Sequence, residues 1–296
     1  VHSRGFPGAV AAGEEDGTHL RPLAAAAAVG VTHVIQVGCD VESSRWAAAA
    51  ATTHDNVWAT VAIHPNDAAR DPDLMSSLAV IRELAALPVV RGIGETGLDY
   101  FRTKKEQAAA QHTSFRAHID ISREVNKPLV IHDRDAHDDV IATLLEYGAP
   151  ETVVFHCFSG DADMARTCAE HGWYMSFSGV VTFGNAQPLR EALAVAPAEL
   201  LLVETDAPFL TPSPYRGTAN SSALLPLTVR AMAQVRGQAE AQMCDILFSN
   251  AHKVFGRPWH AMASILSHAN SHATCRALPQ LAQGLAPQAW SRQVCL

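Results

Sequence analysis

The feature that most constrains the fold of this chain is a regular alternation of short apolar, β-branched runs with segments of helical spacing. Seven runs are candidate strands: residues 32–37, 58–63, 89–93, 128–131, 152–155, 174–178 and 200–203. Each is followed by a candidate helix: residues 43–52, 74–87, 104–125, 138–147, 161–171, 188–195 and 223–235. Short buried strands separated by helices of this length predict parallel βαβ units.

Eight such units would close a TIM (β/α)8 barrel, and we predict this α/β fold for residues 1–258. The eighth strand would have to lie before His2, so the first strand of the barrel is expected to be truncated. Residues 259–296 are rich in Ala, Ser, His and Gln and show no clean period. We expect them to form a divergent, poorly ordered tail.

The composition excludes several classes of protein. Apolar residues make up 48% of the chain and charged residues 18%, which excludes wholesale disorder. The longest near-continuous apolar stretch, residues 23–31, is far shorter than the roughly 20 residues that span a membrane. No signal peptide is recognisable at the start, and the six cysteines include no CxxC pair. We therefore expect the cysteines to be free thiols and the protein to be cytoplasmic and not bound to a membrane.

The net charge of −8 argues against binding of nucleic acid by a broad basic face. It leaves open a nuclease whose acidic groups hold metal ions. Charge alone therefore narrows the mode of binding without deciding the substrate.

Four polar residues at the ends of predicted strands are candidate metal ligands: Glu95, His132, His156 and Asp206. In a parallel barrel the carboxyl ends of the strands share one face, so these four side chains should converge. A lone His after a strand is usually structural, but four such positions favour a metal site. Imidazole and carboxylate suit Zn, Mn, Mg or Fe. Two such ions could clamp the oxygens of a phosphoester, and Asp206 could take a proton from water.

Four other residues follow strands, and three of them have two possible roles each. His64, before Pro65, either contacts the substrate or is a turn residue that the proline fixes. Glu204 lies on the same side of its strand as Asp206 and is expected to support the metal ligands. Arg134 and Arg216 lie in loops, where they either hold a phosphate or are solvated.

Several stretches together resemble the TatD family of metal-dependent deoxyribonucleases: VAIHP at 61–65, GIGETGLDYFR at 92–102, KPLVIHDR at 127–134, VVFHCFSGD at 153–161 and VETDAPFLTPSPYRG at 203–217. The segment SNAHKVFG at 249–256 resembles the closing helix of that family. The resemblance implies a barrel hydrolase that cleaves DNA by metal-activated water, working from 3′ ends and preferring single-stranded ends. It implies neither a membrane nor a protein partner.

The resemblance also implies a role for each matching residue. Glu95 would bridge two divalent cations, which would be Mg, Mn or Zn. His132 and His156 would bind the second cation. Asp206 would bind the first cation and activate water, and His64 would lie beside the substrate phosphate.

The chain departs from the family pattern at two motifs. Most members open with His-x-His, which binds the first cation, whereas this chain opens with His2-Ser3-Arg4. His2 would supply the first imidazole, but Arg4 stays protonated and cannot bind a metal. We therefore predict one tight and one weak metal site. Asn220 is followed by Ser221 and Ser222 where the family has Glu-Pro.

Two other functions remain open from the sequence. A barrel hydrolase could use the same cations on a small ester, lactone or amide, because a metal polarises a carbonyl as it does a phosphoryl group. Alternatively, the chain is a non-catalytic barrel that has lost the first metal site.

Overall fold

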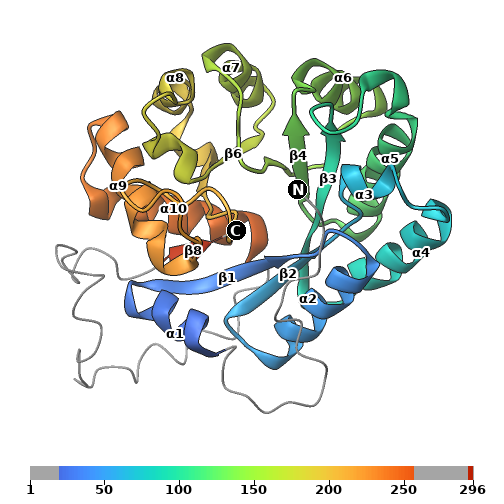
Figure 1. The fold of residues 1–296 in the computed structure, drawn as a ribbon, viewed down its shortest axis with the longest axis horizontal. Helices are drawn as coiled ribbons and strands as arrows, with labels where there is room; N and C mark the ends of the chain where they lie inside the picture. The colour runs from blue at the N-terminus through green and yellow to red at the C-terminus, as the bar shows by residue number, and fades with distance from the viewer. Residues whose placement is uncertain (1–19, 257–292, 296) are drawn as a thin grey trace.

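The computed structural model describes residues 20–256 and 293–295, which form a curled parallel sheet with helices packed around it (Figure 1). The sheet has eight strands in the order β7-β6-β5-β4-β3-β2-β1-β8. Their bounds are Val31–Val37 (β1), Val57–Val61 (β2), Val90–Asp99 (β3), Leu129–Arg134 (β4), Val153–Phe155 (β5), Tyr174–Phe177 (β6), Leu201–Val203 (β7) and Gln293–Cys295 (β8). All seven neighbouring pairs are parallel, as the predicted TIM-barrel fold requires.

The helices follow the strands in sequence and cover the outside of the sheet (Figure 1). They are Leu20–Ala28 (α1), Val41–Thr53 (α2), Pro65–Ala68 (α3), Leu74–Ala85 (α4), Ala109–Val125 (α5), His137–Tyr147 (α6), Ala162–Glu170 (α7), Gln187–Val195 (α8), Leu225–Arg236 (α9) and Glu240–Phe255 (α10). Local sequence sets several ends. The Asp40 carboxylate accepts the Ser43 N–H at 2.7 Å to begin α2, and left-handed Asn126 ends α5.

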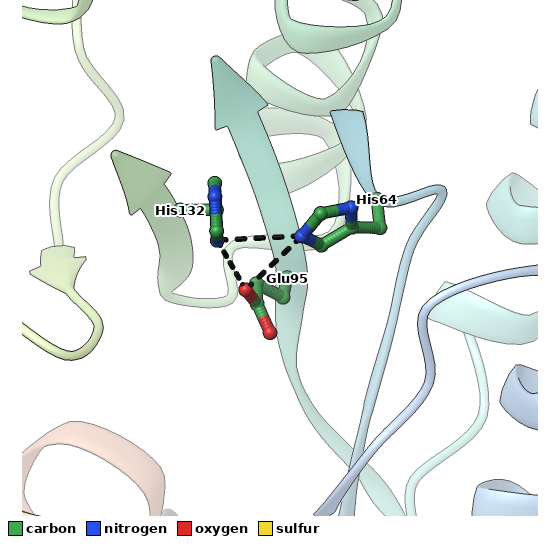
Figure 2. Close-up of side chains that lie close together, drawn as sticks. All are labelled: His64, Glu95 and His132. Atoms are coloured by element: carbon green, nitrogen blue, oxygen red, sulfur yellow. Dashed lines mark hydrogen bonds and ion pairs between the residues drawn. The ribbon is translucent and has the colours of Figure 1, made fainter. Parts of the chain in front are cut away.

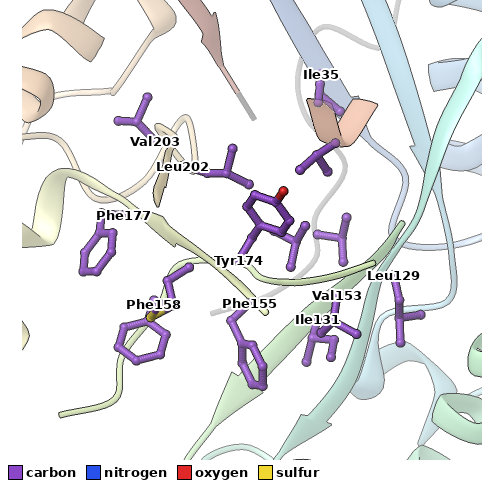
Figure 3. Packing of buried hydrophobic residues seen from close by; sticks show 14 of the residues in the cluster. Ile35, Leu129, Ile131, Val153, Phe155, Phe158, Tyr174, Phe177, Leu202 and Val203 are labelled. Carbon is purple, nitrogen blue, oxygen red and sulfur yellow. The ribbon is translucent and has the colours of Figure 1, made fainter. Parts of the chain in front are cut away.

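The core is built from apolar side chains of neighbouring strands. Leu129 and Ile131 of β4 pack near Phe155 of β5 and Tyr174 of β6, and all four are buried (Figure 3). Strands of this kind are buried on both faces and therefore read as nearly continuous apolar runs. This explains why the seven predicted strands were visible in the sequence.

Two strands extend beyond their predicted ends, which corrects the placement of two candidate residues. The sequence pattern ends a strand at residue 93, yet β3 continues to Asp99, so Glu95 lies inside the strand. Likewise β4 runs to Arg134 and contains His132. The extension of β3 was hidden because its six residues include two glycines, Gly94 and Gly97, which have low strand propensity. At Gly97, with φ +139°, an added Cβ would overlap the carbonyl oxygen of His132.

The eighth strand comes from the other end of the chain. The expected strand before His2 and most of the predicted tail lie outside the described residues. Within that tail, Gln293–Cys295 forms β8, which pairs in parallel with β1 through Val31 and Val34. The boundary near residue 258 stays a prediction. Across the described part of the chain, every helix is too short or too polar to cross a bilayer.

Candidate metal centre

Two histidines lie close to one carboxylate oxygen of Glu95, and the three residues come from consecutive strands or the turn that follows (Figure 2). His64 follows β2, Glu95 lies in β3 and His132 lies in β4. Glu95 Oε1 is 2.6 Å from His132 Nδ1 and 3.4 Å from His64 Nε2, and the two ring nitrogens are 3.3 Å apart. These three atoms lie within 4.8 Å of one another, so the strand ends converge as the barrel predicts.

The second oxygen of Glu95 faces a different pair of residues. His156, the first residue after β5, places Nε2 3.6 Å from Glu95 Oε2. The same nitrogen is 3.8 Å from Oδ1 of Asp206, which follows β7. Glu95 thus lies between His132 on one oxygen and His156 on the other. All four predicted ligands are therefore brought together, whereas His2 lies outside the described residues.

Two of the imidazoles are backed by carboxylates on their far nitrogens. His132 Nε2 is 3.3 Å from Asp99 Oδ2, and His156 Nδ1 is 3.0 Å from Glu204 Oε2. A carboxylate on one nitrogen holds a proton there, so the other nitrogen would offer a lone pair once a metal displaces its own proton. In both rings the nitrogen so exposed is the one that faces Glu95.

His64 has the opposite arrangement, although its Nε2 is close enough to be a ligand. Its Nδ1 accepts the backbone N–H of Asn66 at 3.1 Å, because His64 is the N-cap of α3. The proton of the neutral ring must then lie on Nε2, which faces Glu95. His64 is therefore arranged to donate a hydrogen bond, and distance alone overstates its suitability as a metal ligand.

The residues present fit a divalent cation. Donor atoms around a tetrahedral Zn ion lie about 3.3 Å apart. The 3.6 Å separation of His156 from Glu95 is close to this value, whereas the 2.6 Å hydrogen bond of His132 to Glu95 would have to widen. One carboxylate and two imidazoles, each imidazole hydrogen-bonded to a carboxylate, are oxygen and nitrogen ligands that suit Zn, Mn or Fe. Glu95, His132 and His156 would hold the ion, with Asp206 adjacent.

The charged side chains of the centre shift one another's pKa values. Burial alone would raise the pKa of the Glu95 carboxyl, but His156, His132 and His64 outweigh it and hold the pKa well below its usual range. Burial opposes the charge on His132, yet Asp99 and Glu95 raise its pKa to about 9. Protons on the imidazoles thus balance the carboxylates. A metal ion would release those protons when it binds.

Asp206 differs from the other acidic residues of the centre. Burial, with Glu95 and Glu204 nearby, raises the pKa of its carboxyl to about 7, although His156 acts to lower it. Its backbone is left-handed, with φ 54°, which is uncommon for a residue other than glycine. Asn220 fixes the surrounding loop, since its Nδ2 donates to the carbonyl oxygens of Thr205 and Phe209 at 2.8 Å each.

The two predicted phosphate-binding arginines are exposed, and each lies over an aromatic ring. Arg134 is exposed and its guanidinium lies 3.8 Å from the centroid of the Phe101 ring. Arg216 is exposed and lies 3.8 Å from the Phe183 ring. Among the residues that the structure describes, neither guanidinium forms an ion pair, so both are available to a substrate anion.

Two supporting residues were missed in the sequence. Asp99 shares the side of β3 that carries Glu95, so the period-two alternation could have identified it. It is held by the Asn66 side chain at 2.8 Å and the Arg102 N–H at 2.8 Å. His118 lies in α5 and accepts the N–H of Ile63, next to His64, at 3.1 Å. No local pattern connects residues so far apart.

A β/α barrel with imidazoles and carboxylates gathered at the carboxyl ends of its strands defines the class of metal-dependent barrel hydrolases. The family described as "TatD related DNase" matches residues 12–256. The chain belongs to this family.

Individual relatives agree with that assignment. "Uncharacterized metal-dependent hydrolase TatD" of Mycobacterium tuberculosis is 45% identical over 254 residues, covering 84% of this chain and 96% of the relative. "3'-5' ssDNA/RNA exonuclease TatD" of Citrobacter rodentium is 34% identical, covering 80% and 92%. The crystal structure of YJJV, a TatD homologue from Escherichia coli K12, superposes with TM-score 0.76 at 24% identity, covering 82% and 93%, which shows the shared fold.

Proposed function

We propose that this chain is a deoxyribonuclease that removes nucleotides from the 3′ ends of DNA, preferably single-stranded, by metal-dependent hydrolysis. The observation that carries the proposal is Glu95 between His132 and His156, each ring backed by its own carboxylate. The name of the Citrobacter relative supports a nucleic acid as the substrate. The free thiols of the described cysteines support a cytoplasmic location as part of the proposal.

A divalent cation in this centre supplies charge neutralisation at the phosphoryl group and lowers the pKa of water. Glu95, His132 and His156 would hold a tight ion. Asp206 and Glu95 would hold a weaker one, to which His2 would add. The predicted inequality of the two sites therefore remains part of the proposal, with Mg, Mn or Zn as the candidate metals.

The chain's own residues supply the proton transfers. Asp206, whose carboxylate lies beside His156 at the centre, accepts a proton from the attacking water. His64 donates from Nε2 to an oxygen of the scissile phosphate, because its Nδ1 is occupied by the Asn66 N–H. Arg134 and Arg216 contact phosphates of the bound strand from the rim.

The test is a cleavage assay on end-labelled single-stranded DNA with Mg²⁺ or Mn²⁺, with and without EDTA, beside a generic aryl ester. We expect EDTA-sensitive shortening of the DNA. Turnover of the ester alone would identify a small-substrate hydrolase, and no turnover with any cation would identify a non-catalytic barrel.

Replacing Asp206 tests the assignment of the proton acceptor. We expect Asp206→Ala to lower the rate of cleavage by about 100-fold to 10,000-fold, to the limit of detection, while the fold is retained. Asp163→Asn is the matched control, because Asp163 is an exposed carboxylate on α7 that, among the described residues, forms an ion pair with Arg166 alone. Cleavage that survives in Asp206→Ala would show that another group accepts the proton.

A further inference from the structure

An exposed aromatic ring lies at the rim of the metal centre. Phe101 follows β3 by two residues and is 60% exposed, although the Arg134 guanidinium covers one face of its ring at 3.8 Å. A phenylalanine ring gains free energy when it leaves water, so a ligand that covers Phe101 would be stabilised. The uncovered face is flat, apolar and open to a ligand.

The charges around Phe101 are unusual for an acidic chain. Arg102, Lys104 and Arg134 are all exposed, and none of the three side chains forms an ion pair with a described residue; the Arg134 guanidinium contacts the Phe101 ring. Only Lys105 in this loop is neutralised, by Asp139 at 2.7 Å. A ring bordered by unpaired cations is the combination that binds single-stranded nucleic acid, through base stacking and phosphate attraction.

The strands place this group beside the centre. Arg134 is two residues beyond His132 on β4 and points to the same side of the sheet. It is therefore displaced by only about 7 Å along the strand from a predicted ligand. The register of β3 and β4 pairs Arg134 with Asp99, two residues before Phe101.

We propose that Phe101 is a stacking platform for a nucleobase of the bound single strand, with Arg134 holding the adjoining phosphate. The proposal rests on the proposed nuclease function and specifies how that substrate is gripped. The platform reads no base edge, so it favours unpaired bases of any sequence over a duplex, in which the bases already stack on one another. It thereby gives a physical reason for a preference for single-stranded ends.

The test measures binding of a short single-stranded DNA in EDTA, where cleavage cannot interfere, by fluorescence anisotropy at fixed salt. Phe101→Ala should weaken binding about 5-fold to 150-fold, the range found for loss of one stacked base. Phe101→Trp should retain it. Since Phe101 is exposed, neither variant removes core packing.

Tyr147 provides a matched control within the same chain. It is also an exposed aromatic residue beside an arginine, with the Arg123 guanidinium 5.5 Å from its ring, but it ends α6 at the opposite end of the barrel. Tyr147→Ala should bind DNA as the unmodified protein does. An equal loss in both alanine variants would overturn the platform.

Abasic oligonucleotides identify the stacked base. Removing one base at a single position near the 3′ end should weaken binding to the unmodified protein and leave binding to Phe101→Ala unchanged. If Phe101→Ala binds normally while the unmodified protein cleaves DNA, the platform is wrong and the nuclease function stands. If the unmodified protein neither binds nor cleaves DNA, the proposed function itself fails.

Discussion

The turn between β2 and α3 and the end of β4 each bring an imidazole to the same oxygen of Glu95, but they present it differently. His64, in the turn, receives a backbone N–H on its far nitrogen, and His132, in β4, faces the Asp99 carboxylate with its far nitrogen. Both rings donate toward Glu95, because a carboxylate oxygen can only accept. On His132 a second proton faces Asp99, so a metal that displaces the Nδ1 proton would find a lone pair there. Their distances from Glu95, 3.4 Å and 2.6 Å, would not separate these roles.

The difference teaches that the partner on the far nitrogen assigns a histidine at such a centre. A backbone amide at a helix start can only donate, so it fixes the proton on the opposite nitrogen. A buried carboxylate can only accept, so it draws the proton toward itself. We therefore expect His64 in the β2–α3 turn to donate a proton and His132 at the end of β4 to bind the metal.

The largest effects are expected when the imidazoles of His132 and His64 are removed one at a time. His132→Ala should weaken the tight metal site by more than about 100-fold, because loss of a direct ligand costs more than loss of its supporting partner. His64→Ala should leave metal affinity unchanged and lower kcat by about 100-fold to 10,000-fold. Calorimetric metal titration with kinetics separates the two results.

The same titration checks the predicted inequality of the metal sites. Two equally tight sites in the unmodified protein would contradict it. Equal losses of metal affinity in both alanine variants would mean that His64 is a ligand after all.

A smaller effect should follow from weakening the support of His132 alone. Asp99→Asn keeps the size of the side chain but removes the charge that draws the ring proton, so metal affinity should fall about 10-fold to 100-fold. Glu204→Gln makes the equivalent change behind His156, and the two losses can be compared directly. If Asp99→Asn left metal affinity unchanged but reduced kcat, the difference between the two regions would disappear.

The smallest effect concerns the stability of the β2–α3 turn. Burial lowers the pKa of His118 to about 4, and its neutral ring accepts the Ile63 N–H. The folded pKa lies below the unfolded value, so the unfolded chain binds more protons; this stabilisation is complete above about pH 6.5 and is lost progressively toward about pH 4.

For His118 alone, this linkage lowers the free energy of unfolding by about 1 kcal/mol between about pH 7 and pH 5.5. Urea unfolding at both pH values measures it, with His118→Gln as the comparison. Between these two pH values the free energy of unfolding of His118→Gln should fall by about 1 kcal/mol less than that of the unmodified protein. Equal pH dependence in both proteins would show that His118 does not control the turn.

Much of the fold was accessible from the sequence because it depends on local apolar runs. All seven predicted strands are present, including the short β5 and β7. The continuation of β3 through Thr96 and Gly97 was not accessible, because it depends on pairing with β4 rather than on residue propensity. The strand β8 was missed for the same reason, since its position is defined by β1 at the other end of the chain.

The sequence by itself determined that Glu95, His132, His156 and Asp206 would meet, because parallel strands carry whatever follows them to one face. Only the tertiary structure decided how each side chain is used. The turn at Asn66 places the proton of a neutral His64 on Nε2, and Asp99 of the neighbouring strand faces Nε2 of His132, which leaves Nδ1 toward Glu95. Proton positions depend on partners brought together by folding, and residue order alone does not specify them.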